Sequence, residues 1–292
     1  MAIKKLDPVT GQHTTGHEWN GIEELDNPVP RVVKFFLIVT TLFGIVYWVL
    51  MPAWPLGVTY TKGLLGIDQR DTVTQKVQQA AVSRSVWMNQ IAEKDFADIL
   101  ADTGLMAHVE ATGSTLFADN CSVCHGTGGT GGPGFPNLTT SSWLWGGEPD
   151  AIAETIRVGI NSSHPETRMS QMLAFGQDDV LQRSEIMDVV AYVRSLSGLE
   201  PAEKEPEKIN AGEAIFAENC AACHGDDATG STDVGAPDLT DKHWIYGGDL
   251  QSVYTSVSSG RQGQMPAWEG RFTPVEIKLL TAYVSTLRSA AP

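Results

Sequence analysis

Two thiols and an imidazole stand at the same close spacing in two places in this chain. The pattern C-x-x-C-H occurs at residues 121–125 as CSVCH and at residues 220–224 as CAACH. Thiols two residues apart can add to the two vinyl groups of one porphyrin, and the histidine that follows is then held beneath the iron as its proximal ligand. The sequence therefore predicts two covalently bound haem c groups.

The two motifs belong to an internal repeat. Residues 117–121 read FADNC and residues 216–220 read FAENC, and a glycine follows the histidine in both copies. A chance match, or an isolated redox or zinc motif, would not repeat its flanks in this way. The chain has four cysteines and the motifs use all of them, so no thiol remains for a disulfide or a separate metal site.

A haem that only transfers electrons needs a second axial ligand, and a thioether sulfur raises its potential relative to a second histidine. After residue 187 the only methionine is Met265. The first repeat offers three, but the segment QMLAF around Met172 aligns with QMPAW around Met265, which favours Met172 over its neighbour Met169. We expect Met187 to pack in a helical core instead.

We expect each methionine to serve the haem of its own repeat, although the sequence leaves an exchange between the repeats open. The predicted iron ligands are therefore His125, Met172, His224 and Met265. The full set of predicted haem-binding residues is Cys121, Cys124, His125, Met172, Cys220, Cys223, His224 and Met265.

Other residues near the motifs have less specific roles. An aromatic residue followed by two glycines occurs at Trp145 and again at Tyr246, where we expect the ring to pack on the haem edge and the glycines to let the backbone approach. His164 is interpreted as a loop residue, because no histidine outside the motifs stands at a haem-ligand spacing in both copies.

A long uncharged segment precedes the repeats. Residues 35–56 contain no charged side chain over 22 positions, and about 20 apolar residues in a helix span a bilayer. A cleaved signal peptide fits less well, because the run is too long and follows an acidic-containing arm, and a buried soluble helix is the weaker alternative. Basic residues cluster on the N-terminal side, which together with the haem motifs predicts a cytoplasmic N-terminus.

The elements expected around these sites are helical, so the fold class is all-α. The arm is rich in turn formers and is expected to be mostly irregular, and the charged, proline-containing run after residue 198 is expected to be a linker. Helices are expected over about 72–100, from about 111 into the first motif, over 179–196 and from the capping box of Thr273 and Glu276 onward. The predicted segments are 1–31, arm; 32–56, transmembrane helix; 57–107, connecting segment; 108–198, first haem domain; 199–208, linker; 209–292, second haem domain.

The acidic balance limits the possible partners. The 292-residue chain carries a net charge of −15, which repels nucleic acid and can steer basic partners. A run of acidic residues follows the second motif, and we expect this surface to dock a basic donor cytochrome c. The run comprises Asp226, Asp227, Asp233, Asp238 and Asp241.

The arm carries a family resemblance. Residues 15–30, TGHEWNGIEELDNPVP, resemble the N-terminal signature of the dihaem subunit III of cbb(3)-type cytochrome c oxidases. The layout agrees: an arm, one membrane helix and two tandem class I cytochrome c domains. The resemblance implies a bacterial inner-membrane complex with periplasmic haem domains. It also implies that electrons pass from a donor cytochrome c toward a monohaem cytochrome c subunit and a haem–copper catalytic subunit.

Two other functions are compatible with the haem motifs alone. A membrane-anchored dihaem cytochrome could serve another periplasmic reductase, and only the arm argues against this. A dihaem peroxidase would need one iron with an open site, whereas both repeats offer a methionine. We therefore expect electron transfer, with no substrate chemistry on this chain itself.

Overall fold

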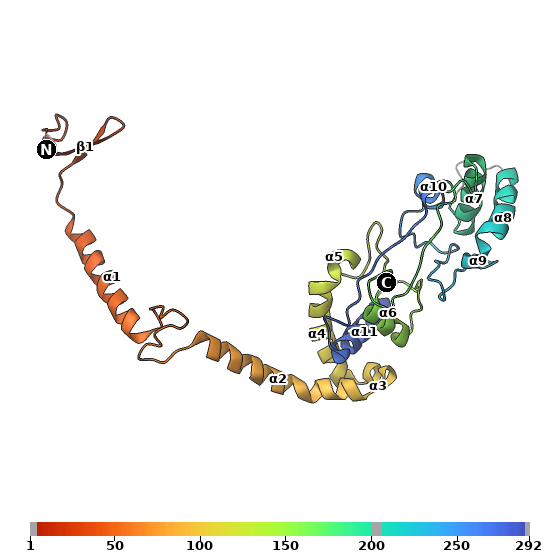
Figure 1. Ribbon diagram of the computed structural model, residues 1–292, viewed down its shortest axis with the longest axis horizontal. Coiled ribbons are helices and arrows are strands. Elements are labelled where there is room, and N and C mark those ends of the chain that lie inside the picture. Colours follow the sequence, from red (N-terminus) through yellow and green to blue (C-terminus); the bar gives the residue numbers. More distant parts are fainter. Residues whose placement is uncertain (1–4, 200–205, 290–292) are drawn as a thin grey trace. The chain divides into compact units, whose positions relative to one another are not determined.

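The computed structural model describes residues 5–199 and 206–289 (Figure 1). Most of the predicted linker, residues 200–205, therefore lies outside the described residues. The chain divides into two compact units, Met1–Ser83 and Arg84–Pro292. Apart from a short hairpin and isolated bridges, the regular secondary structure of the described residues is helical, as expected for the predicted fold class.

The arm in the first unit is more ordered than the sequence analysis expected. Strands β1 (Thr14–Trp19) and β2 (Ile22–Leu25) pair antiparallel as a hairpin. The turn is Asn20-Gly21, with φ of 51° and 85°, which is the backbone that a two-residue hairpin turn requires. The Asn-Gly dipeptide was the signal that the expectation of an irregular arm overlooked.

The apolar segment forms helix α1 (Arg31–Leu50). It is the one helix of the described chain that is long and apolar enough to cross a membrane, and none of its side chains is buried. The helix ends six residues before the predicted boundary at 56. Pro52 accounts for this, because proline lacks an N–H and disfavours helical backbone in the residue before it.

Helix α2 (Gln69–Glu93) ends earlier than expected, and two aspartates start the next helices. Asp95 caps α3 (Phe96–Ala101), and the carboxylate of Asp102 accepts hydrogen bonds from the first amides of α4 (Thr103–Asn120). The helix that leads into the first motif thus begins eight residues before the expected start at 111. The side-chain cap satisfies amides that would otherwise lack a partner.

The second unit contains the two motifs, each on a single helical turn that follows a longer helix. Its remaining helices are α5 (Ser122–His125), α6 (Pro149–Val158), α7 (Arg183–Leu196), α8 (Pro206–Asn219), α9 (Ala221–His224), α10 (Leu250–Ser259) and α11 (Pro274–Ser289).

These helices form two hydrophobic cores that do not coincide with the two repeats. The first core joins α4 and α6 of the first repeat to α11 of the second (Figure 1). Phe117 of α4 packs on Tyr283 of α11 with ring centroids 5.7 Å apart. At Gly113, an added Cβ would stand 2.6 Å from the Tyr283 Cβ, so glycine lets the two helices cross closely.

The second core combines the remaining parts of the two repeats. It joins α7 of the first repeat to α8 and α10 of the second. Phe216 of α8 packs on Tyr192 of α7 at 5.4 Å, and an added Cβ at Gly212 would stand 2.8 Å from the Tyr192 Cβ. The repeats have therefore exchanged their C-terminal halves, and the second core is built from one continuous stretch of chain.

The two exchanged segments cross in a pair of short backbone bridges. Ile160 and Met265 hydrogen-bond each other through both main-chain groups at 2.9 Å, and Met172 and Arg261 do so at 2.8 and 3.2 Å. Gly159 and Gly260 precede the bridges with φ of 70° and 68°, a left-handed backbone that glycine adopts without strain. Each methionine segment is thus held against the half-repeat that it has joined.

Candidate haem sites

Both motif histidines are oriented for a ligand on one ring nitrogen. The Nδ1 atom of His125 lies 3.1 Å from the Pro136 carbonyl oxygen, and Nδ1 of His224 lies 3.0 Å from that of Pro237. A carbonyl only accepts, so Nδ1 carries the proton and Nε2 is left with its lone pair for iron. Burial lowers the pKa of both imidazoles, which favours the neutral form that binds metal.

The four cysteines of the motifs form no disulfide. Burial, and then the neighbouring cysteine, raises the pKa of the first thiol of each motif, Cys121 and Cys220, to about 11. In the polypeptide without its cofactor these thiols stay protonated at neutral pH. The same burial gives a thioether bond an apolar setting.

The methionines lie opposite to the expected pairing. Met265 and Cys121 border the first core, whereas Met172 and Cys220 border the second. The structure therefore brings each methionine to the motif of the other repeat, which is the alternative that the sequence left open. Met169, the competing candidate, is 68% exposed.

Buried donors without partners mark where a porphyrin carboxylate would fit. Among the described residues, the indole Nε1 atoms of Trp143, Trp145 and Trp244 and the Nε atom of Arg168 are buried with no hydrogen-bond partner. Buried donors are normally satisfied, and the propionates of a haem supply acceptors. Trp143 and Trp244 line a cavity of about 690 Å³ between the loops 130–144 and 229–245 that follow the two motifs. The residues present therefore fit a haem at each motif.

Two arginines near the methionines were missed by the sequence analysis. The guanidinium of Arg168 lies over the ring of Trp145 at 5.0 Å, and that of Arg261 lies over Tyr246 at 4.3 Å. Both expected haem-edge aromatics are thus covered by a cation. The repeat contained the signal, because RMSQM and RQGQM place an arginine four residues before each methionine.

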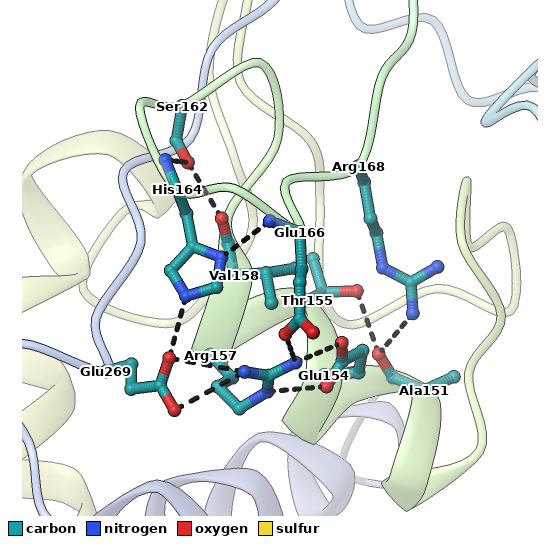
Figure 2. A network of polar contacts seen from close by, with 10 residues as sticks. All are labelled: Ala151, Glu154, Thr155, Arg157, Val158, Ser162, His164, Glu166, Arg168 and Glu269. Carbon is teal, nitrogen blue, oxygen red and sulfur yellow. Dashed lines mark hydrogen bonds and ion pairs between the residues drawn. The ribbon is translucent and has the colours of Figure 1, made fainter.

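His164 lies in a loop, as the sequence analysis interpreted it, and it contacts no motif residue directly. Its Nε2 atom lies 2.7 Å from a carboxylate oxygen of Glu269, in a network of polar contacts around Arg157 (Figure 2). This network joins segments of both repeats and was not visible from sequence spacing.

Two exchanged cores, each with one C-x-x-C-H turn, a neutral histidine and a methionine at its border, define a dihaem c-type cytochrome. Three family models match consecutive parts of the chain. They are the N-terminal domain of cytochrome oxidase-cbb3, FixP, over residues 11–58; cytochrome c over 110–197; and cytochrome c oxidase, cbb3-type, subunit III over 207–284.

Curated relatives match over nearly the whole length. The chain is 47% identical over 285 residues to the cbb3-type cytochrome c oxidase subunit FixP of Bradyrhizobium sp. (strain ORS 278), covering 97% of each chain. It is 42% identical over 294 residues to the subunit CcoP of Azospirillum brasilense and 41% identical over 289 residues to that of Cereibacter sphaeroides, covering 98% of this chain and 99% of each relative. The chain belongs to the FixP/CcoP family of cbb3-type cytochrome c oxidase subunits.

Family membership confirms the resemblance inferred from the arm, and the two cytochrome c domains imply two covalent haem c groups. The apolar helix α1 and this identity together fit a membrane-anchored protein. An oxidase subunit works with other subunits of its complex.

Proposed function

We propose that this chain passes electrons through its two haems from a donor cytochrome c toward the monohaem cytochrome c and haem–copper catalytic subunits of a cbb(3)-type oxidase. This proposal is supported by the match to FixP and CcoP subunits over nearly the whole chain, with both haem motifs present. The alternative functions, a subunit of another reductase or a dihaem peroxidase, lack such an observation.

We further propose that the two protein ligands of each haem iron would come from different repeats. His125 and Met265 would hold the haem bound to Cys121 and Cys124. His224 and Met172 would hold the haem bound to Cys220 and Cys223. Each haem would supply a one-electron ferric–ferrous couple, and a histidine and a methionine on the same iron would leave no site for oxygen or peroxide.

The protein's own residues orient and enclose these groups. The carbonyls of Pro136 and Pro237 fix the tautomer of the proximal histidines, which also raises their basicity as ligands. The buried indole and guanidinium donors are placed to bind propionates, and the surrounding core excludes water.

The proposed topology places the N-terminus in the cytoplasm and both haem cores in the periplasm. Arg31 and Lys34 at the start of α1 support it, because basic residues favour the cytoplasmic side of a membrane helix. Attachment of haem c outside the cytoplasm in this class of cytochrome supports the same orientation.

Affinity purification of the tagged full-length chain from solubilised membranes tests the proposed function. We expect a haem–copper subunit and a monohaem cytochrome c to co-purify in equal amounts, with oxygen consumption driven by reduced cytochrome c. An untagged strain provides the background control. Isolation of the chain with a different reductase, or alone with peroxidase activity, would contradict the proposal.

The loop after the second motif is the proposed docking surface for the donor. Residues 121–147 carry no charged side chain, whereas the matching residues 220–248 carry five aspartates and one lysine. Asp226 and Asp233 are exposed there. A basic donor would be steered to the second haem by this charge difference between the repeats.

We expect the second-order rate of reduction by a basic cytochrome c to fall by about tenfold or more between low and physiological salt. Stopped-flow measurements with Asp226→Asn/Asp233→Asn should show a lower rate at low salt and a shallower salt dependence. Glu93→Gln/Glu110→Gln removes the same charge elsewhere on the haem-bearing unit and should change the rate little. A rate independent of salt, or equal effects of both double variants, would exclude this docking surface.

A further inference from the structure

A branched ion-pair network lies at the end of α6, beside the segment that carries Glu269 (Figure 2). The guanidinium of Arg157 binds Glu154 at 2.8 Å, Glu166 at 2.5 Å and Glu269 at 3.2 Å. The three carboxylates come from different places: α6 itself, the loop that leads to Met172, and the exchanged segment just after Met265. One side chain therefore links the loop at Glu166 and the segment after Met265 to α6.

Glu269 is the residue that attaches the exchanged segment. Its carboxylate also accepts a hydrogen bond from Nε2 of His164 at 2.7 Å, because Nδ1 of that ring accepts from the Glu166 amide. These neighbours, His164 first and then Arg157, hold the pKa of Glu269 below its usual range. The backbone amides of Trp268 and Glu269 both donate to the Arg157 carbonyl at 3.2 Å. Main-chain and side-chain contacts thus bind the segment to the same residue of α6.

The other repeat provides an internal comparison, because its methionine segment docks through the same main-chain pattern. The Phe175 amide donates to the Val257 carbonyl, and the Gly176 amide to that of Ser258, both at 3.1 Å. Gly176 therefore corresponds to Glu269, and Ser258 to Arg157. Neither carries a charge, and an added Cβ at Gly176 would stand 2.5 Å from the Ser258 Oγ, so close packing replaces the ion pairs there.

We propose that Arg157, Glu269 and His164 form an ionic clamp that positions the Met265 segment and so determines how firmly Met265 holds the first haem iron. This inference rests on the proposed role of Met265 as an iron ligand. The Met265 segment follows α10 of the second core and is far from α6 along the chain. Only non-covalent contacts can therefore hold it against α6. The Met172 segment docks on α10 through main-chain hydrogen bonds and close packing, and neither Gly176 nor Ser258 carries a charge there. The two iron–sulfur bonds should therefore respond differently to loss of charge.

The residues of the clamp act as positioning residues, since none is placed to touch the haem iron. Exposed ion pairs are individually weak, and Glu269 and Glu166 are partly exposed. The effect expected from one pair is therefore a moderate increase in how often the Met265 segment opens. A ligand that competes with the thioether for ferric iron measures this opening directly.

The test uses the full-length ferric protein titrated with imidazole, with the red absorption band of thioether-ligated haem followed for each haem. Glu269→Gln should raise the imidazole affinity of one haem by about threefold, and Arg157→Met by on the order of tenfold. Arg157→Lys keeps the charge without the forked geometry and should lie between wild type and Arg157→Met. The second haem should titrate as in the wild type.

Glu154→Gln is the matched control. It removes a carboxylate from the same guanidinium, but Glu154 lies on α6 and not on the exchanged segment, so the affinity should stay within about twofold of wild type. The clamp is refuted if Glu269→Gln changes neither haem, if it changes both equally, or if Glu154→Gln has the same effect. A wild-type protein without the thioether band would instead refute the proposed ligation, so the two failures are distinguishable.

Discussion

Replacement of Cys121 and Cys124 by alanine is expected to unfold α4, α6 and α11 together while the middle of the haem-bearing unit stays folded. The first core is small and its helices pack around the position proposed for the haem. A protein core of this size is marginal without a group that completes it. Because α11 belongs to this core, loss of the first haem should unfold α11 as well.

Limited proteolysis with mass spectrometry, together with a haem count and circular dichroism, checks this prediction. Cleavage should occur near the first motif and within residues 274–289, while the helices α7, α8 and α10 resist. Cys220→Ala/Cys223→Ala should give the complementary pattern. Full helicity and protease resistance in the first variant, or protection of α11 with cleavage confined to the first repeat, would contradict the role of the haem or the exchange.

Met265→His is expected to lower the potential of the haem attached at Cys121, and Met172→His that of the haem attached at Cys220. An imidazole in place of a thioether stabilises the ferric state, and axial ligands tune haem potentials over about 0.8 V across proteins. We expect a decrease of on the order of 0.2 V for the affected haem and little change in the other.

Redox titration followed by NMR assigns the change to a haem. The second of the two residues between the cysteines differs between the motifs, Val123 against Ala222, so contacts of the porphyrin substituents with these side chains identify each group. If Met265→His instead shifted the haem beside Ala222, each methionine would serve its own repeat, and the exchanged ligation would be wrong.

Much of the local structure could be predicted from the sequence, because it depends on neighbours along the chain. The apolar run predicted α1, and the repeated C-x-x-C-H predicted the attachment turns. Thr273 and Glu276 predicted the start of α11, and the structure confirms this capping box, with the Thr273 amide donating to the Glu276 carboxylate at 2.8 Å. The hairpin in the arm was predictable in the same way from Asn20-Gly21, but its signal was overlooked.

The pairing of halves could not be predicted from local sequence. The helices α4 and α8 each present a glycine and a phenylalanine four residues apart, and α7 and α11 each present the tyrosine that packs on them. Each tyrosine could therefore pack on either phenylalanine. The Arg157 clamp was hidden for the same reason, since Glu269 and His164 are 105 residues apart and meet only through the exchange.

The sequence by itself determined the chemistry of this protein: the number of haems, their thiols and histidines, the methionines available and the membrane helix. The tertiary structure alone decided which methionine lies beside which motif. The physical reason is that the repeats are similar enough for both pairings to bury the same surfaces. The path of the chain through the crossing at Ile160 and Met265 selects one of them.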